Sequence, residues 1–212
     1  MPTPTEQAYT ELQQAYNFFN KQLFAGQLPP CLITMQRKNR TYGYFSGERW
    51  HDTTGKVTDE IALNPVHFAT RSTDEVLSTL VHEMVHLWQH HCGKPSRSSY
   101  HNKEWAAKMD ALGLCPSDTG MEGGKRTGQH MNHYVVTGGP YAKAATELLA
   151  SGFVISWRDR AREDAPGKGK PSGKAGVRMK YTCPDCGLNA WAKPEVVLVC
   201  GACEVTLEAD EA

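Results

Sequence analysis

The chain has 212 residues and a mass of 23.5 kDa, enough for one sizeable hydrophobic core and a second, smaller unit. Lys and Arg number 23, as do Asp and Glu, so the zero net charge excludes a uniformly basic nucleic-acid coat and a uniformly acidic protein. No run approaches eighteen apolar residues, and the first residues lack the basic and apolar regions of a signal peptide. We therefore expect an intracellular protein without membrane contact: cytoplasmic or nucleoid-associated if bacterial or phage-encoded, and nuclear if eukaryotic.

The first part of the chain predicts one long helix followed by short strands. Apolar residues recur at helical spacing across residues 3–24, with Thr3-Pro4 as cap and first turn and Gly26 as the end. The apolar stripe of this helix consists of Tyr9, Leu12, Tyr16, Phe19 and Leu23. β-prone side chains then predict strands over residues 31–38 and 41–46 and a third strand that ends at residues 60–63.

The middle of the chain predicts mostly helices. The apolar period becomes helical from residue 74 to about residue 91, and Ser72 and Glu75 just before it have the spacing of a capping box. Three more elements are expected further on: helices over residues 103–112 and 141–150, and a short strand over residues 153–157. Together these elements predict an α+β domain with a small mixed or antiparallel sheet.

The composition changes near residue 157. Residues 157–180 contain eight Lys or Arg and three Asp or Glu, a net charge of +5, together with the Gly, Pro and Ser content of a flexible connector. Such a segment is either a solvated tether or a region that binds a nucleic-acid backbone, and the composition does not choose between them. We therefore divide the chain into a domain over residues 1–157, a basic linker over residues 158–180 and a terminal unit over residues 181–212.

Four of the seven cysteines form two C-x2-C pairs that are thirteen residues apart. Two such pairs can direct four thiolates to the corners of a tetrahedron, which suits a structural Zn²⁺ ion. Disulfides or a redox motif are less favoured, because redox C-x-x-C motifs normally occur singly. The terminal unit is too short to fold on its own core, so we expect zinc to hold it together. The ligands would be Cys183, Cys186, Cys200 and Cys203, while Cys31, Cys92 and Cys115 are expected to be small buried hydrophobes.

The best-signalled helix contains an H-E-x-x-H motif, formed by His82, Glu83 and His86. Residues four apart on a helix differ by about 40° in direction, so the two imidazoles project from one face and can hold one metal ion. Glu83 flanks the same face, where it can take a proton from a metal-bound water. Two surface histidines on a helix would be the simpler alternative.

A catalytic zinc site needs a third protein ligand and an open position. Gln89 and Cys92 stand where a metzincin would have glycine and histidine, so that class is excluded. The adjacent His82-Glu83 pair also disfavours a nucleobase deaminase, whose motif is H-x-E. Two candidates for the third ligand follow the next turn, His101 and Glu104, and spacing alone does not choose between them. Weaker candidates are His90, His91, His130 and His133.

The motif and its surroundings resemble the SprT-like family, which includes the Spartan proteases that cut proteins covalently trapped on DNA. The resemblance covers roughly residues 8–157 and 181–204 and includes the four-cysteine zinc ribbon at the end. It rests on five ordered segments: Tyr42-Gly43-Tyr44-Phe45, Glu60-Ile61-Ala62-Leu63-Asn64-Pro65, His82-Glu83-Met84-Val85-His86-Leu87-Trp88-Gln89, Tyr100-His101-Asn102-Lys103-Glu104-Trp105, and Gly113-Leu114 with Pro116-Ser117.

This resemblance implies a zincin-like metalloprotease domain followed by a small zinc ribbon. It implies that His101 is the third ligand of a catalytic Zn²⁺ ion, beside His82 and His86, and that Glu83 is the general base. A second, structural Zn²⁺ ion would lie in the ribbon. The resemblance also implies that the ribbon lies near the active site and contacts DNA.

DNA contacts are expected from the linker and the ribbon. Tyr181 and Trp191 have rings that can stack on unpaired bases, although Trp191 can equally well pack over the zinc knuckles. The expected partner is therefore single-stranded or partly unpaired DNA. Contacts to its phosphates are expected from Lys168, Lys170, Lys174, Arg178, Lys180 and Lys193.

The resulting hypothesis is a zinc-dependent endopeptidase, a hydrolase that DNA directs to DNA-bound or DNA-crosslinked proteins during DNA repair. A substrate segment would pair as an extra strand along an exposed edge near residues 41–46. One alternative is a regulatory or architectural DNA-binding zinc protein whose H-E-x-x-H metal site is not proteolytic. Another keeps the peptidase but makes its target unrelated to DNA.

Overall fold

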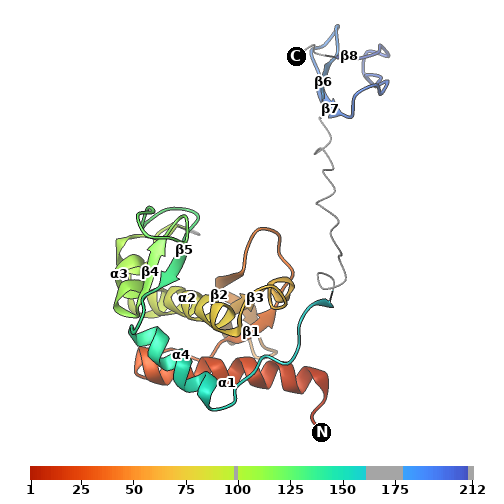
Figure 1. Ribbon diagram of the computed structural model, residues 1–212. Helices are drawn as coiled ribbons and strands as arrows, with labels where there is room; N and C mark the ends of the chain where they lie inside the picture. Colours follow the sequence, from red (N-terminus) through yellow and green to blue (C-terminus); the bar gives the residue numbers. More distant parts are fainter. Residues whose placement is uncertain (98–99, 161–178, 210–212) are drawn as a thin grey trace. The chain divides into compact units, whose positions relative to one another are not determined.

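The structure is a computed structural model that describes residues 1–97, 100–160 and 179–209 (Figure 1). The chain divides into two compact units, Met1–Asp164 and Ala165–Ala212, and the division falls inside the basic segment over residues 158–180. Among the described residues, no helix is both long and apolar enough to span a membrane. Four expected DNA contacts lie outside the described residues: Lys168, Lys170, Lys174 and Arg178.

The first unit is a mixed α+β structure. Its described part has the helices α1 (Pro4–Phe24), α2 (Thr73–Cys92), α3 (Lys103–Ala111) and α4 (Pro140–Ala150), with a short 3-10 helix at Pro65–His67. Its strands are β1 (Leu32–Met35), β2 (Gly43–His51), β3 (Val57–Leu63), β4 (Leu114–Ser117) and β5 (Asn132–Val135).

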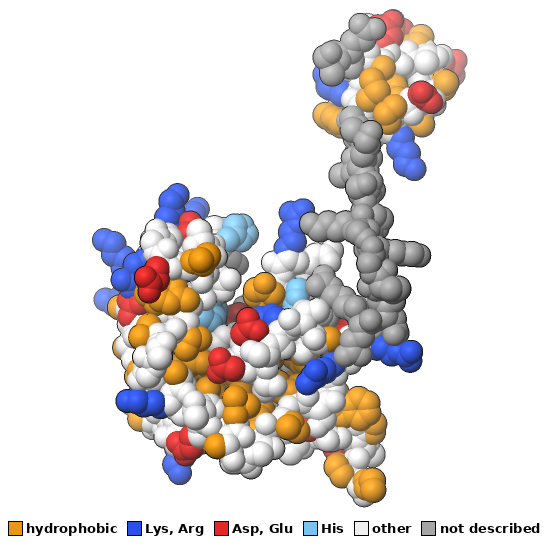
Figure 2. Space-filling view, in the orientation of Figure 1, with side chains coloured by type: hydrophobic (Ala, Val, Ile, Leu, Met, Phe, Trp, Pro, Cys, Tyr) orange, Lys and Arg blue, Asp and Glu red, His pale blue; other side chains and the backbone are white. Residues whose placement is uncertain are grey.

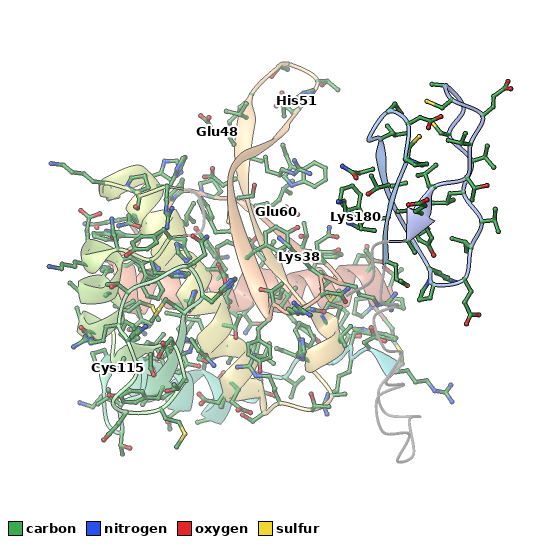
Figure 3. All side chains as sticks on the ribbon, turned by 90° about the horizontal axis from the view of Figure 1, so that it is seen from above. Lys38, Glu48, His51, Glu60, Cys115 and Lys180 are labelled. Carbon is green, nitrogen blue, oxygen red and sulfur yellow. The ribbon has the colours of Figure 1, made fainter. Side chains whose placement is uncertain are left out.

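The main sheet has three strands in the order β1-β3-β2. β1 runs parallel to β3 and β2 runs antiparallel to it, so the sheet is mixed, as expected from the sequence. A register shift between Ser46 and Trp50 interrupts the pairing of β2 with β3, and Glu48 within it has a φ of +49°. Figure 3 shows the β2–β3 hairpin extending outward, with Glu48 and His51 on its outer part. β4 and β5 form a separate antiparallel pair.

Capping residues set the ends of the two long helices. The Thr3 hydroxyl accepts from the Glu6 N–H, and the Glu6 carboxylate accepts from the Thr3 N–H; Ser72 and Glu75 make the same reciprocal pair at the start of α2. α1 ends at Ala25, in the left-handed conformation. Both capping boxes confirm the helix starts expected from the sequence.

α2 is the central element of the first unit. It contacts β2, β3 and the other three helices, and its middle is buried on all sides. α1 and α4 lie side by side, and both contact α2 (Figure 1). The core they share extends from Leu12 on α1 to Ile155 after α4, and none of the histidines belongs to it. Apolar packing therefore positions the middle of α2, and polar contacts such as the Tyr141 hydroxyl donating to the Asp74 carbonyl add to it near the start of the helix.

The strand expected over residues 153–157 is wrong. Phe153 and Ile155 are buried, which explains the alternating pattern, but neither belongs to a strand or pairs with one among the residues that the structure describes. Instead, the Ser156 N–H donates to the Glu11 carboxylate and the Trp157 indole N–H donates to the Gln7 side chain. The segment is thus attached to α1 through side chains and not through a backbone ladder.

Two smaller expectations about buried residues are also wrong. Tyr9 is 40% exposed, because the buried stripe of α1 runs through Ala8 and Ala15 beside Leu12 and Phe19. Cys92 is exposed at the end of α2, and Cys31 and Cys115 are only partly buried.

The second unit contains a three-stranded antiparallel sheet in the order β7-β6-β8. Its strands are β6 (Met179–Thr182), β7 (Asn189–Ala192) and β8 (Glu208–Ala209). The buried core of this unit is very small and consists of Tyr181, Cys183, Cys200 and Leu207. Half of that core is therefore cysteine.

Candidate metal centre and active-site cleft

Three histidines come together inside the first unit. His82 and His86 project from one face of α2, and His101 lies just before α3. Each offers one ring nitrogen, and these three nitrogens lie within 4.8 Å of one another. The ring centroids are 4.7 to 5.4 Å apart. We refer to His82, His86 and His101 as the histidine group.

His101 is fixed by a two-way backbone bridge to Gly128. The His101 N–H donates to the Gly128 carbonyl at 2.9 Å, and the Gly128 N–H donates to the His101 carbonyl at 3.1 Å. The ring Nδ1 also lies 3.1 Å from the same Gly128 carbonyl. Because a carbonyl can only accept, Nδ1 carries the proton and Nε2 keeps its lone pair for a ligand.

The histidine group is buried and neutral. His82 and His101 are 8% and 7% exposed, and the Trp105 ring packs against all three imidazoles at centroid distances of 4.4 to 5.2 Å. Burial lowers the pKa of His86 to about 3 and also lowers the pKa values of His82 and His101, with neighbouring histidines adding to the effect for His82 and His86. Neutral imidazoles have a free lone pair at neutral pH, so this group suits a metal ion.

Glu83 lies beside the histidine group and is 5% exposed. Burial raises the pKa of its carboxyl to about 8, although the nearby Lys38 charge and a hydrogen bond from the Phe45 backbone oppose the shift. A carboxylate whose pKa is this high is a stronger base than an exposed glutamate.

A cleft of about 860 Å³ opens over these residues. Its lining includes the histidine group, Glu83, residues 41–47 at and just before the start of β2, and residues 129–133, which lead into β5. Figure 2 shows this face of the first unit hollowed, with histidine side chains around the hollow. The histidine group and Glu83 are therefore reached from solvent through this cleft.

Sequence reasoning left His133 as a weak ligand candidate, and the structure places it behind His82. Its Nδ1 lies 3.3 Å from His82 Nδ1, and its Nε2 lies 3.0 Å from the Ser78 hydroxyl, which donates to the Glu75 carbonyl. One arrangement of protons satisfies this series of hydrogen bonds: His82 Nδ1–H donates to His133 Nδ1, and His133 Nε2–H donates to the Ser78 hydroxyl. That arrangement leaves His82 Nε2 free to bind a metal. In the sequence, the β-prone run over residues 132–136 was the signal that could have predicted β5, the strand that carries His133.

Glu104, the other candidate for the third ligand, is not in the histidine group. Its carboxylate accepts from the Gln89 side chain and from the Lys94 N–H, both at 2.7 Å. These hydrogen bonds lower the pKa of Glu104. Its contacts instead connect the end of α2 to the start of α3.

The four cysteines of the second unit also come together. Their sulfur atoms lie within 4.8 Å of one another, and all seven cysteines of the chain are free thiols. Each pair sits on a similar backbone turn: the Cys183 and Cys200 N–H groups donate to Leu188 and Val205, five residues on. N–H groups of Ala202 and Cys203 lower the pKa of the Cys200 thiol to about 7. We refer to Cys183, Cys186, Cys200 and Cys203 as the cysteine group.

The described DNA-contact candidates fall on two faces of the β6–β7 ladder. Lys180 is the direct cross-strand partner of Trp191, which is 61% exposed. Tyr181 faces the other way, because successive strand residues alternate between faces. It is 4% exposed, and its hydroxyl donates to the Lys193 carbonyl, so its ring is part of the core and not available for stacking. The Lys193 side chain is exposed.

Comparison with known proteins gives two matches. The profile described as the SprT-like family matches residues 12–123, a range that includes the histidine group and Glu83. A protein of Salmonella typhimurium, described as an uncharacterized protein in the mucB 3' region, is 56% identical over 59 residues, which is 27% of this chain and 80% of that relative. None of the solved structures matches the chain significantly.

Proposed function

Because the chain belongs to the SprT-like family, we propose that its first unit is a zincin-like metalloprotease domain that acts as a zinc-dependent endopeptidase. Family membership supports a zinc metalloprotease-type domain. The observation that carries the proposal is the convergence of His82, His86 and His101 at the base of a cleft that also contains Glu83.

The donor set fits a catalytic zinc ion. Three neutral imidazoles can approach one ion at about 2.0–2.1 Å, and three protein ligands leave a fourth position open. His101 and His82 each have Nδ1 engaged in a hydrogen bond, so both can present Nε2. When bound, zinc would supply Lewis acidity, polarising the scissile carbonyl and making water acidic at neutral pH.

Glu83 is the proposed general base. Its carboxylate takes a proton from the attacking water and returns it to the leaving amine, so one group serves both proton transfers. Burial of the side chain favours this role, because the raised pKa brings proton affinity close to working pH. The Phe45 backbone hydrogen bond and the Lys38 charge oppose burial within that pKa of about 8, and the positive charge of a bound zinc ion would favour the carboxylate form further.

The substrate would bind along β2. This strand is at the edge of the sheet, and its residues 43–47 line the same cleft as the loop that carries His130. An extended peptide can add to such an edge through backbone hydrogen bonds, which do not depend on its side chains. Gly43 brings the strand close to the core, since a Cβ there would lie 2.8 Å from the Ala62 carbonyl oxygen.

The second unit is the proposed DNA-binding part. The cysteine group would hold a structural zinc ion, and the exposed Trp191 ring beside Lys180 offers one stacking surface with an adjacent positive charge. With the basic segment over residues 158–180, this unit would bind single-stranded or partly unpaired DNA. Cleavage would then be directed to proteins bound or crosslinked to DNA, in DNA repair.

A cleavage assay with three DNA conditions tests this function. A DNA-binding protein would be incubated with the full chain and no DNA, single-stranded DNA or duplex DNA, with Glu83→Gln beside each condition. We expect cleavage that depends on DNA and is lost in Glu83→Gln. DNA binding without cleavage, in protein that holds its zinc, would favour the non-proteolytic alternative. Cleavage that is the same with and without DNA, and that persists when residues 165–212 are deleted, would favour a peptidase with targets unrelated to DNA.

A further inference from the structure

A third group of metal-ligating side chains lies where the end of α2 meets the β2–β3 hairpin. Asp59, His90 and His91 each offer one ligand atom, and these atoms lie within 4.8 Å of one another. None of them belongs to the histidine group or the cysteine group. We propose that Asp59, His90 and His91, here called the hairpin site, bind a further divalent transition metal ion of the zinc class.

Both imidazoles face one carboxylate from different sides. His91 Nε2 lies 2.7 Å from Asp59 Oδ2, and His90 Nε2 lies 3.9 Å from Asp59 Oδ1. The two rings are perpendicular, with centroids 4.9 Å apart. Consecutive helical side chains diverge by about 100°, so a shared partner requires that partner to lie between them. Asp59 on β3 occupies that position.

The surrounding backbone holds this arrangement in place. The register shift in β2 lets the Glu48 N–H donate to Asp59 Oδ1 at 2.8 Å, which orients the carboxylate. At Gly47, a Cβ would come within 2.8 Å of the His90 ring, so the hairpin can approach His90 this closely only with glycine there. Phe45 packs against the other part of the His90 ring, at a centroid distance of 5.6 Å. Such supporting contacts are typical of metal ligands.

The burial pattern leaves a path for an ion. The Asp59 side chain is 6% exposed, whereas those of His90 and His91 are 33% and 38% exposed. The site is therefore closed on the sheet side and open on the solvent side, where water can complete the coordination. Two imidazoles and a carboxylate suit zinc and similar ions. Ligand atoms around tetrahedral zinc are about 3.3 Å apart, and the two Asp59–histidine distances of 2.7 and 3.9 Å lie on either side of that value.

The hairpin site adjoins the cleft. His90 and Gly47 both line it, and His90 follows His82 and His86 at the same four-residue spacing along α2. An ion at this site would connect the end of α2 to the hairpin that forms one cleft wall. Zinc there would therefore make the hairpin more resistant to local opening. Because two of its three ligands are partly exposed, it would fill after the cysteine group.

Zinc stoichiometry of the full chain tests the proposal. Metal-free protein would be titrated with zinc against a weak competing chelator. We expect three bound ions in the wild-type protein, but two in His91→Ala and two in Asp59→Asn. Asparagine keeps an oxygen that can accept from the Glu48 N–H, so Asp59→Asn removes the charge with little change to the hairpin. His51→Ala is the matched control, since this exposed hairpin histidine lies outside the site, and it should bind three ions.

A fourth variant distinguishes loss of metal from the hairpin site from loss of metal from the histidine group, on which the proposed function depends. His86→Ala removes a ligand of the histidine group, so it should lose one ion, and His86→Ala combined with His91→Ala should lose two. The hairpin site is refuted if the wild-type protein binds only two ions. It is equally refuted if folded His91→Ala and Asp59→Asn, checked by circular dichroism, bind as many ions as the wild-type protein. In either case His91 and Asp59 form only a hydrogen-bonded pair at the end of a helix.

Discussion

The histidine group and the cysteine group are supported by very different amounts of protein. His82 and His86 lie on α2, which packs against β2, β3 and the other three helices, and His101 lies just before α3. In the second unit, the buried core consists of two cysteines, Tyr181 and Leu207. We therefore expect the first unit to form its site before metal binds, and the second unit to need metal in order to fold. An ion held by preformed ligands is not needed for folding and can take part in catalysis. An ion that takes the place of a hydrophobic core stabilises the fold instead.

Removal of metal should separate the two units most clearly. A strong chelator removes a contribution of about 10–16 kcal/mol from a small structural zinc unit. We expect residues 179–209 to unfold while α1 to α4 persist, as followed by amide NMR spectra. Restoration of zinc should restore the lost signals. Unfolding of both units together, or of neither, would remove the distinction between them.

Substitution of His101 or Glu104 tests which of the two is the third metal ligand of the first unit. His101→Ala leaves two imidazoles, so we expect the first unit to lose its metal and peptidase activity to fall by more than about 100-fold. Glu104→Gln should retain metal and most activity, because its side chain hydrogen-bonds Gln89 and Lys94 and not the metal site. Metal content and cleavage rate would be measured for both. The reverse ranking would assign the ligand role to Glu104.

Acid should destabilise the metal-free first unit. The folded-state pKa values of His86 and His133 are about 3 and about 4, below the usual 6.5, so the unfolded chain binds more protons between pH 6.5 and 4. The stabilisation from these two histidines is therefore full above pH 6.5 and is lost as the pH falls, by up to about 1.4 kcal/mol per unit for each histidine. Glu83, with its pKa raised to about 8, opposes this trend because its protonated form is favoured on folding.

A variant isolates the share of His133 in that acid response. His133→Asn should reduce the slope of unfolding free energy against pH by up to about 1.4 kcal/mol per unit between pH 6.5 and 4. Urea unfolding at four pH values would measure the slope, and His51→Ala should leave it unchanged. An unaltered slope in His133→Asn would mean that His133 is not buried in its neutral form.

DNA binding should depend on the outer face of the β6–β7 ladder and not on its core. Trp191→Ala should weaken single-stranded DNA binding by about 1–3 kcal/mol, the usual contribution of one stacked base. Val197→Ala is a control, because Val197 is an exposed apolar residue outside this ladder. Tyr181→Phe should keep the affinity, because Tyr181 is buried. Fluorescence anisotropy would measure all three, and equal affinities for Trp191→Ala and wild type would exclude stacking by Trp191.

Local signals in the sequence were sufficient for the long helices, for the cysteine group and for two of the three histidines. The caps at Thr3 and Ser72 and the H-E-x-x-H spacing act within a few residues, so they can be recognised without the fold. Spacing alone left His101 and Glu104 open, and the family resemblance favoured His101. In the structure His101 lies beside His82 and His86 and is bridged to Gly128, a contact between distant residues. For the same reason, residues 153–157 were mistaken for a strand, since their alternating burial comes from packing on α1.

The most direct test of the proposed mechanism compares zinc content and peptide-bond cleavage in the wild-type protein and Glu83→Gln. Glu122→Gln, a change at an exposed glutamate, is the control. We expect all three proteins to hold the same zinc and Glu83→Gln alone to lose about 10²- to 10⁴-fold in cleavage rate, the usual contribution of a general base. Cleavage by Glu83→Gln at the wild-type rate, with zinc retained, would contradict the assignment of Glu83 as the base.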